Sequence, residues 1–129
     1  MANTFSGIQE ILGMYSFNPY VKRSKYGNKK TVVGNIVFDS KKESERFLEL
    51  SMLEKAGIIQ NLERQKRFEI IPKTQTERAA YYVADFVYFK DGEKIAEDVK
   101  SSITRKNPTY IIKRKLFKYR YPEYKFQEV

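Results

Sequence analysis

The chain has 129 residues, enough for one domain that buries roughly two-thirds of the surface of its unfolded chain. Its 25 lysine and arginine residues exceed its 16 acidic residues, which gives a formal net charge of +9. This excess favours a polyanionic partner such as nucleic acid. The chain contains no cysteine and no histidine, which excludes disulfides, zinc fingers, cysteine nucleophiles and histidine bases.

The start of the chain carries Glu10 and lacks a basic stretch before an apolar core. We therefore expect no secretory signal. No apolar run approaches the length of a membrane span, so we expect a soluble, intracellular protein without membrane contacts.

The first predicted element is a short amphipathic helix, because apolar residues recur at i, i+3, i+4 and i+7. These residues are Ile8, Ile11, Leu12 and Tyr15, and Asn18-Pro19 would end the helix. Its apolar side needs cover, either from the core of the same chain or from a partner subunit. We assign residues 1–24 to this helix and a basic linker, and residues 25–129 to the main domain.

A basic connector and a small hairpin follow. Residues 22–30 end in Lys29 and Lys30 and include Gly27-Asn28, a composition typical of a solvated connector. Thr31 to Val33 and Ile36 to Phe38 surround Gly34-Asn35, which predicts a hairpin.

The next segment has the start signal of a helix. Ser40 and Glu43 form an S-x-x-E capping box, and apolar residues continue to about Ala56-Gly57. At 100° per residue Glu43 points into the apolar arc, while Glu45 and Glu49 fall on the opposite side. Glu43 either serves only the cap or also reaches a functional site.

Two predicted strands bring two aspartates together. After a strand from Arg67 to Pro72, the runs Tyr81 to Phe89 and Lys94 to Ser101 alternate around Asp91-Gly92, a strong hairpin turn. If Lys90 and Glu93 flank a two-residue turn, Asp85 lies directly opposite Asp98. Opposed residues hold their Cβ atoms ~4.5–5.5 Å apart, and like charges there repel.

A divalent cation would offset this repulsion, because Mg²⁺ takes one or two carboxylates together with water and phosphate oxygens. Alternation also places Lys100 on the same face as Asp98, beside the predicted metal. The competing explanations are an exposed ion pair between Asp98 and Lys100 and an edge charge at Asp85 that discourages aggregation. Glu97 faces the other way, where we expect it to be solvated or paired with a basic residue.

Asn107-Pro108 predicts the start of a second helix, with an apolar stripe of Ile112, Leu116 and Tyr119, and Pro122 stops it. A last strand runs from Tyr124 to Val129. The predicted fold class is therefore α/β, with a core of order αβββαβ after the short N-terminal helix and hairpin.

A helix acid, an aspartate on one strand and D-x-K on the next resemble the PD-(D/E)XK nuclease superfamily, which includes restriction enzymes and Holliday-junction resolvases. The resemblance covers residues 25–129. The chain more closely resembles a DUF1064-like family of small phage proteins assigned to that superfamily. The matching segments are Tyr26, Phe38-Asp39-Ser40-Lys41-Lys42-Glu43, Ala84-Asp85-Phe86, Glu97-Asp98-Val99-Lys100 and Lys113-Arg114-Lys115-Leu116-Phe117. Ala84 replaces the proline of the motif, and Asp98 stands where glutamate is more common.

The resemblance implies a restriction-endonuclease-like fold, with a mixed central sheet flanked by helices, and phosphodiester hydrolysis in DNA. It assigns Asp85, Asp98, Glu43 and the carbonyl of Val99 to a Mg²⁺ ion, for which Mn²⁺ can substitute. Lys100 is the implied catalytic lysine, next to the catalytic acids. It also implies a location in the cytoplasm of a phage-infected bacterium.

Basic side chains supply the candidate DNA contacts. They are Lys113, first by resemblance, then Arg114, Lys29 and Lys30, with Gln65 as a residue that orients substrate or Glu43. Contacts of this kind with phosphates give affinity without sequence information. Solvated helix flanks are the alternative for the cations. Tyr26, Tyr110 and Tyr121 either stack on unpaired bases or fill the core.

The sequence thus predicts a Mg²⁺-dependent DNA endonuclease, selective for branched DNA by analogy with junction resolvases. Two incisions across a branch require two sites, which a homodimer would supply. The alternative is a noncatalytic DNA-binding accessory protein that keeps the nuclease fold and leaves DNA intact.

Overall fold

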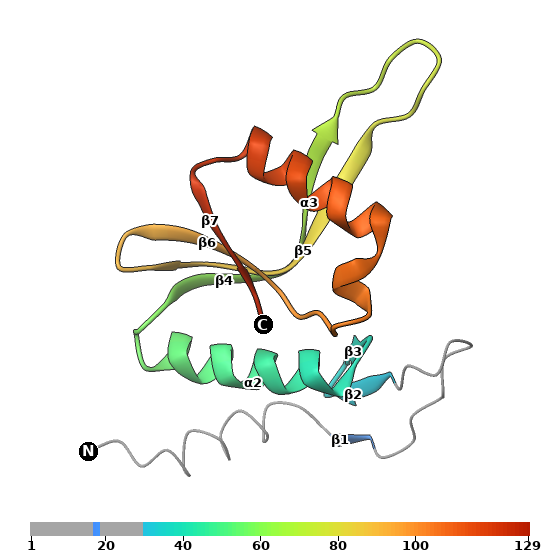
Figure 1. Cartoon of the computed structure of the whole chain (residues 1–129). Coiled ribbons are helices and arrows are strands. Elements are labelled where there is room, and N and C mark those ends of the chain that lie inside the picture. Colours follow the sequence, from blue (N-terminus) through green and yellow to red (C-terminus); the bar gives the residue numbers. More distant parts are fainter. Residues whose placement is uncertain (1–16, 19–29) are drawn as a thin grey trace. The chain divides into compact units, whose positions relative to one another are not determined.

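The structure, a computed structural model, describes residues 17–18 and 30–129 and forms two compact units, Met1–Ile58 and Ile59–Val129 (Figure 1). The predicted helix at Ile8 to Tyr15 lies outside the described residues, as does Lys29. The predicted domain boundary after residue 24 also falls there and stays a prediction. No helix in the described part is long and apolar enough to span a membrane.

Among the described residues, the first unit contains a three-stranded antiparallel sheet and helix α2 (Lys41–Lys55). The strands are β1 (Phe17–Asn18), β2 (Thr31–Val33) and β3 (Ile36–Phe38), in the order β1-β2-β3. The predicted hairpin is confirmed, since Val33 pairs with Ile36 across the turn.

Helix α2 (Lys41–Lys55) begins where the capping box predicts. The Ser40 hydroxyl accepts a 3.1 Å hydrogen bond from the backbone N–H of Glu43, which satisfies one of the free donors of the first turn. The predicted phase of the helix is also confirmed. Glu43 is buried, whereas the Glu45 and Glu49 side chains are 58% and 62% exposed and pair with cations of their own helix.

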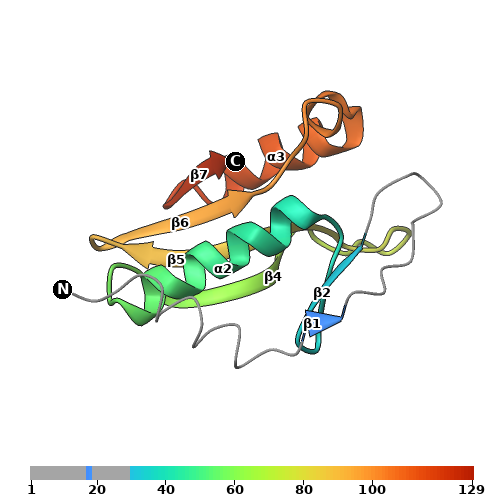
Figure 2. The same cartoon turned by 90° about the horizontal axis from the view of Figure 1, so that it is seen from below.

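The second unit is a mixed four-stranded sheet with one helix against it (Figure 2). Its strands are β4 (Gln60–Ile71), β5 (Ala80–Lys90), β6 (Glu93–Asp98) and β7 (Tyr124–Glu128), in the order β4-β5-β6-β7. The first three pair antiparallel, and β7 pairs parallel to β6. The predicted α/β fold class and the order αβββαβ of its elements are confirmed.

The hairpin of β5 and β6 has the predicted register. Lys90 pairs with Glu93, and the pairing continues step by step to Phe86 and Glu97. Asp91 and Gly92 both adopt positive φ angles, of 51° and 77°. This is the backbone that a two-residue type I′ turn requires, and it explains why Asp-Gly fixes the register.

Helix α3 (Pro108–Arg120) covers the core of this unit. The Asn107 side chain accepts a 3.2 Å hydrogen bond from the N–H of Tyr110, so the predicted cap is confirmed. Phe117 is fully buried, with its ring 4.8 Å from the rings of both Phe68 and Tyr82. These contacts anchor the first residues of strand β5, near the candidate site.

Strand β4 begins seven residues earlier than the prediction of Arg67, at Gln60. Its added residues are mostly charged or amide and carry no clear apolar alternation. They are ordered by backbone pairing with β5, for example Arg64 with Phe86. A short 3₁₀ turn, Thr104–Lys106, also precedes α3.

Candidate active site

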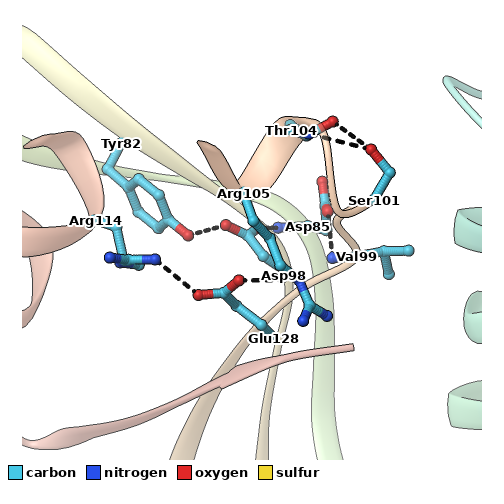
Figure 3. A network of polar contacts seen from close by, with 9 residues as sticks. All are labelled: Tyr82, Asp85, Asp98, Val99, Ser101, Thr104, Arg105, Arg114 and Glu128. Carbon is cyan, nitrogen blue, oxygen red and sulfur yellow. Dashed lines mark hydrogen bonds and ion pairs between the residues drawn. The ribbon is translucent and has the colours of Figure 1, made fainter. Parts of the chain in front are cut away.

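Asp85 and Asp98 lie side by side on β5 and β6, one step beyond the pair of Phe86 and Glu97. The backbone N–H of Asp85 donates a 3.0 Å hydrogen bond to Oδ1 of Asp98. The N–H of Val99 donates a 2.9 Å bond to Oδ2 of Asp85 (Figure 3). Each carboxylate is therefore held by the backbone of the neighbouring strand, as the predicted register requires.

Both carboxylates are buried, and their charges interact. Asp98 is fully buried and Asp85 is 8% exposed. Burial, and next the charge of Asp85, raise the pKa of Asp98 to about 6, while Lys100 and Tyr82 act in the opposite direction. A cation between the two aspartates would relieve both causes of this shift.

The sequence reasoning missed Tyr82 as a part of this site. Its hydroxyl donates a hydrogen bond to Oδ2 of Asp98 in the interior (Figure 3). Burial and the charge of Asp98 raise the pKa of Tyr82, so its hydroxyl stays protonated and keeps donating. Tyr82 is one of several aromatic residues in the predicted strand, and no sequence signal pairs it with an acid 16 residues further along the chain.

Gln65, predicted to orient substrate or Glu43, lies within β4 and contacts Asp85. Its Nε2 donates a 3.3 Å hydrogen bond to Oδ1 of Asp85. Gln65 has a φ of 51°, in the left-handed region, where a residue other than glycine carries strain on the order of 1 kcal/mol. Nearby, Ala84 and Val87 belong to the same core cluster, although regular alternation would separate them. The unusual backbone angle thus lies on β4 at Gln65, while the pairing on both sides of Asp85, Arg64 with Phe86 and Lys66 with Ala84, keeps one register.

Lys100 lies beside Asp98, as predicted. Its backbone N–H donates to the carbonyl of Val129 at 3.1 Å, and the N–H of Val129 donates to the carbonyl of Asp98 at 2.8 Å. These bonds extend the pairing with the last strand and fix the direction of Lys100. Its ammonium lies 5.1 Å from the centre of the Tyr110 ring, and Lys100 and Asp98 line one pocket.

Two predicted DNA contacts on α3 have different surroundings. Lys113 lines the same pocket as Asp98 and Lys100. Arg114 forms a 3.0 Å ion pair with Glu128, which also pairs with Arg105 at 3.3 Å. Arg114 is thus already paired, and a phosphate would compete with Glu128 for it.

The remaining predicted residues do not belong to the unit that holds this site. Lys30 is exposed and Glu43 is buried, both in the first unit, and their roles at the site stay predictions.

Glu97 was expected to be solvated or paired with a basic residue, and the solvated alternative is wrong. Glu97 is fully buried and accepts a 2.7 Å hydrogen bond from the hydroxyl of Tyr88. An acid flanked by Ala96 and Asp98 near a strand end gave no sign of this tyrosine, because the two residues lie on different strands.

The carboxylate oxygens of Asp85 and Asp98 are suitable ligands for a hard divalent cation. Two carboxylates are a usual protein share of a Mg²⁺ shell, which water and phosphate oxygens complete. The Val99 N–H points to Asp85, and in extended backbone the carbonyl of the same residue faces the same neighbouring strand. Within residues 17–18 and 30–129, no three acidic, histidine or cysteine side chains form a group suited to a metal, so the site would depend on two carboxylates.

The chain belongs to the family described as "Protein of unknown function (DUF1064)", whose model matches residues 23–129. This match confirms the predicted likeness to DUF1064 proteins. Comparison with curated proteins gave no match, and neither did comparison with solved structures.

Proposed function

We propose that this chain is a Mg²⁺-dependent DNA endonuclease of the PD-(D/E)XK type, which hydrolyses phosphodiester bonds. The observation that carries the proposal is the pairing of two buried carboxylates, Asp85 and Asp98, each bonded to the backbone of the other strand. Lys100 lines a pocket together with Asp98. A structural role alone does not require two like charges in one interior.

Asp85, Asp98 and the carbonyl of Val99 are the groups that would hold the cation. When bound, Mg²⁺ supplies Lewis-acid chemistry, because it neutralises charge on a phosphate and lowers the pKa of water. Mn²⁺ should substitute for it.

The other residues act on the substrate or on the acids. The ammonium of Lys100 can hold a phosphate oxygen or orient the attacking water. Tyr82 fixes the orientation of the Asp98 carboxylate, and Gln65 does the same for Asp85. Glu43 remains the helix acid that the resemblance assigns.

The charge of the chain supports DNA as the substrate. A net charge of +9 favours phosphate contacts, and Lys113 places a cation in the pocket of Asp98 and Lys100. We infer action on branched DNA by a homodimer, in the cytoplasm of a phage-infected bacterium, from the resemblance alone.

The second candidate is a noncatalytic DNA-binding accessory protein. The ion pair of Arg114 with Glu128 and the hydrogen bonds on both carboxylates would then be structural.

A cleavage assay separates the two candidates. Plasmid, linear duplex and four-way junction DNA are incubated with the protein in Mg²⁺ or Mn²⁺, with EDTA as the metal-free control. We expect metal-dependent cleavage that Asp85→Asn abolishes and Asp91→Asn retains, because Asp91 is an exposed turn residue with the same charge. DNA binding without cleavage of any substrate would favour the accessory role.

A further inference from the structure

A pocket of about 530 Å³ lies beside Asp98 and Lys100. Its other walls come from Tyr81 and Tyr82 on β5 and from the first turns of α3, where Thr109 and Lys113 lie. This volume is within the range of ~300–1,000 Å³ that small-molecule sites occupy. It is suited to one nucleotide and not to a base pair held in a duplex.

The lining has the chemistry that a nucleotide needs. Lys100 and Lys113 are two cations for a phosphate. The Asn107 NH₂ group, whose amide oxygen caps α3, and the Thr109 hydroxyl are polar groups for a base edge. Asp98 also lines the pocket, so one end of the pocket adjoins the candidate metal site.

Tyr81 is the aromatic wall best placed to receive a base. The Arg67 guanidinium lies over one face of this half-buried ring, 4.1 Å from its centre, so a base would stack on the opposite face. Tyr82 instead stacks on Phe117, with ring centres 4.8 Å apart, and its hydroxyl serves Asp98. Base stacking on an aromatic side chain contributes ~1–3 kcal/mol per base.

We propose that this pocket takes up one nucleotide that is unpaired or flipped out of the duplex, with its base against Tyr81 and its phosphate at Lys100 and Lys113. The proposal rests on the proposed nuclease function and names its substrate class: DNA with an unpaired nucleotide next to the cleaved bond, as in gaps, flaps, branch points and single strands. A base must leave its stack to lie against Tyr81 in the wall of this open recess, and that step costs least where the base is already unpaired.

The test is metal-free binding in EDTA. Three DNAs of one sequence carry 2-aminopurine at the same position: an intact duplex, a duplex with this base on a one-nucleotide flap, and a single strand. We expect affinity for the unpaired forms to exceed that for the duplex by about 5- to 100-fold, with a change in 2-aminopurine fluorescence on binding.

Variants of Tyr81 decide whether the pocket is responsible. Tyr81→Ala should remove the preference and the fluorescence change, while Tyr81→Phe should keep both. Tyr119→Ala is the matched control, because Tyr119 lies on α3, is 83% exposed and does not line the pocket. Equal affinity of the wild type for all three DNAs, or an unchanged preference in Tyr81→Ala, would overturn the proposal.

Failure of this proposal differs from failure of the nuclease function. A protein that binds the unpaired nucleotide through Tyr81 but cleaves no DNA keeps the pocket assignment and loses the nuclease assignment. A protein that cleaves DNA equally well with Tyr81→Ala, and with no preference for unpaired nucleotides, keeps the nuclease assignment and loses the pocket assignment.

Discussion

The backbone of Asp85 holds the side chain of Asp98, through a 3.0 Å hydrogen bond from the N–H of one residue to Oδ1 of the other. In the other direction, the N–H of Val99 donates a 2.9 Å hydrogen bond to Oδ2 of Asp85. The two acids are therefore fixed relative to each other by the hairpin itself. The repulsion between the two charges disfavours the folded state when both carboxylates are ionised.

Removing the charge of Asp98 should stabilise the metal-free protein. Its folded-state pKa of about 6 lies above the ordinary value of 3.8, so the folded protein binds this proton more tightly than the unfolded chain does. The resulting stabilisation is present at low pH and is lost as the pH rises from about 4 to about 6. At pH 7 in EDTA, Asp98→Asn should raise the free energy of unfolding by about 1–2 kcal/mol in urea titrations.

The gain should vanish well below pH 3.8, the ordinary pKa, because Asp98 is then protonated in both states. A gain of the same size at both pH values, or a loss at pH 7, would contradict the charged, buried state that we assign to Asp98.

Removing the hydroxyl of Tyr82 should have the opposite effect. Tyr82→Phe deletes a donor to a buried carboxylate and should lower the free energy of unfolding by about 1.5–3 kcal/mol at pH 7. Tyr119→Phe, at an exposed position, is the control and should change it by less than about 0.5 kcal/mol.

A double-mutant cycle shows whether this effect passes through Asp98. In the Asp98→Asn background Tyr82→Phe should cost clearly less than in the wild type. Equal costs in the two backgrounds would mean that Tyr82 contributes only through packing on Phe117.

The helix acids offer a matched pair of substitutions. Glu43→Gln should abolish DNA cleavage and Glu45→Gln should leave it nearly intact, because the resemblance assigns the helix acid of the site to Glu43, whereas Glu45 is 58% exposed and pairs with Lys41. Rates are compared at saturating Mg²⁺, with circular dichroism to confirm folding. Full activity of Glu43→Gln would leave Glu43 with its capping role alone.

Lys113 should contribute to DNA affinity through phosphate contact. Lys113→Gln should weaken binding at low salt and reduce the slope of log affinity against log salt by about 0.7–0.9, the value for one phosphate contact. Lys90→Gln removes the same charge at the turn between β5 and β6, far along the hairpin from Asp85, and should leave the slope unchanged. Equal slopes for both variants would remove Lys113 from the interface.

The sequence predicted best what local chemistry determines. Asp91-Gly92 specifies the turn, the turn specifies the register, and the register brings Asp85 to Asp98. The same holds for the caps of the two described helices, where Ser40 and Asn107 accept backbone bonds.

Features that depend on contacts across the sheet could not be predicted. The first half of β4 is polar and is ordered by its pairing with β5, which no periodicity records. The hydrogen bonds of Tyr82 to Asp98 and of Tyr88 to Glu97 join β5 to β6. The sequence indicates whether a strand residue faces the core or solvent, and does not indicate its partner on the next strand. The expectation of a solvated Glu97 is the clearest error that followed, because Glu97 is fully buried.

The most direct test of the central claim is Mn²⁺ uptake, followed by the loss of the electron paramagnetic resonance signal of free Mn²⁺ in the presence of DNA. The wild type is compared with the double variant Asp85→Asn, Asp98→Asn, so that ions bound by the DNA and by other acids cancel. We predict that the wild type takes up at least one more Mn²⁺ per chain than the variant. Equal uptake by the two proteins would contradict a metal site at Asp85 and Asp98.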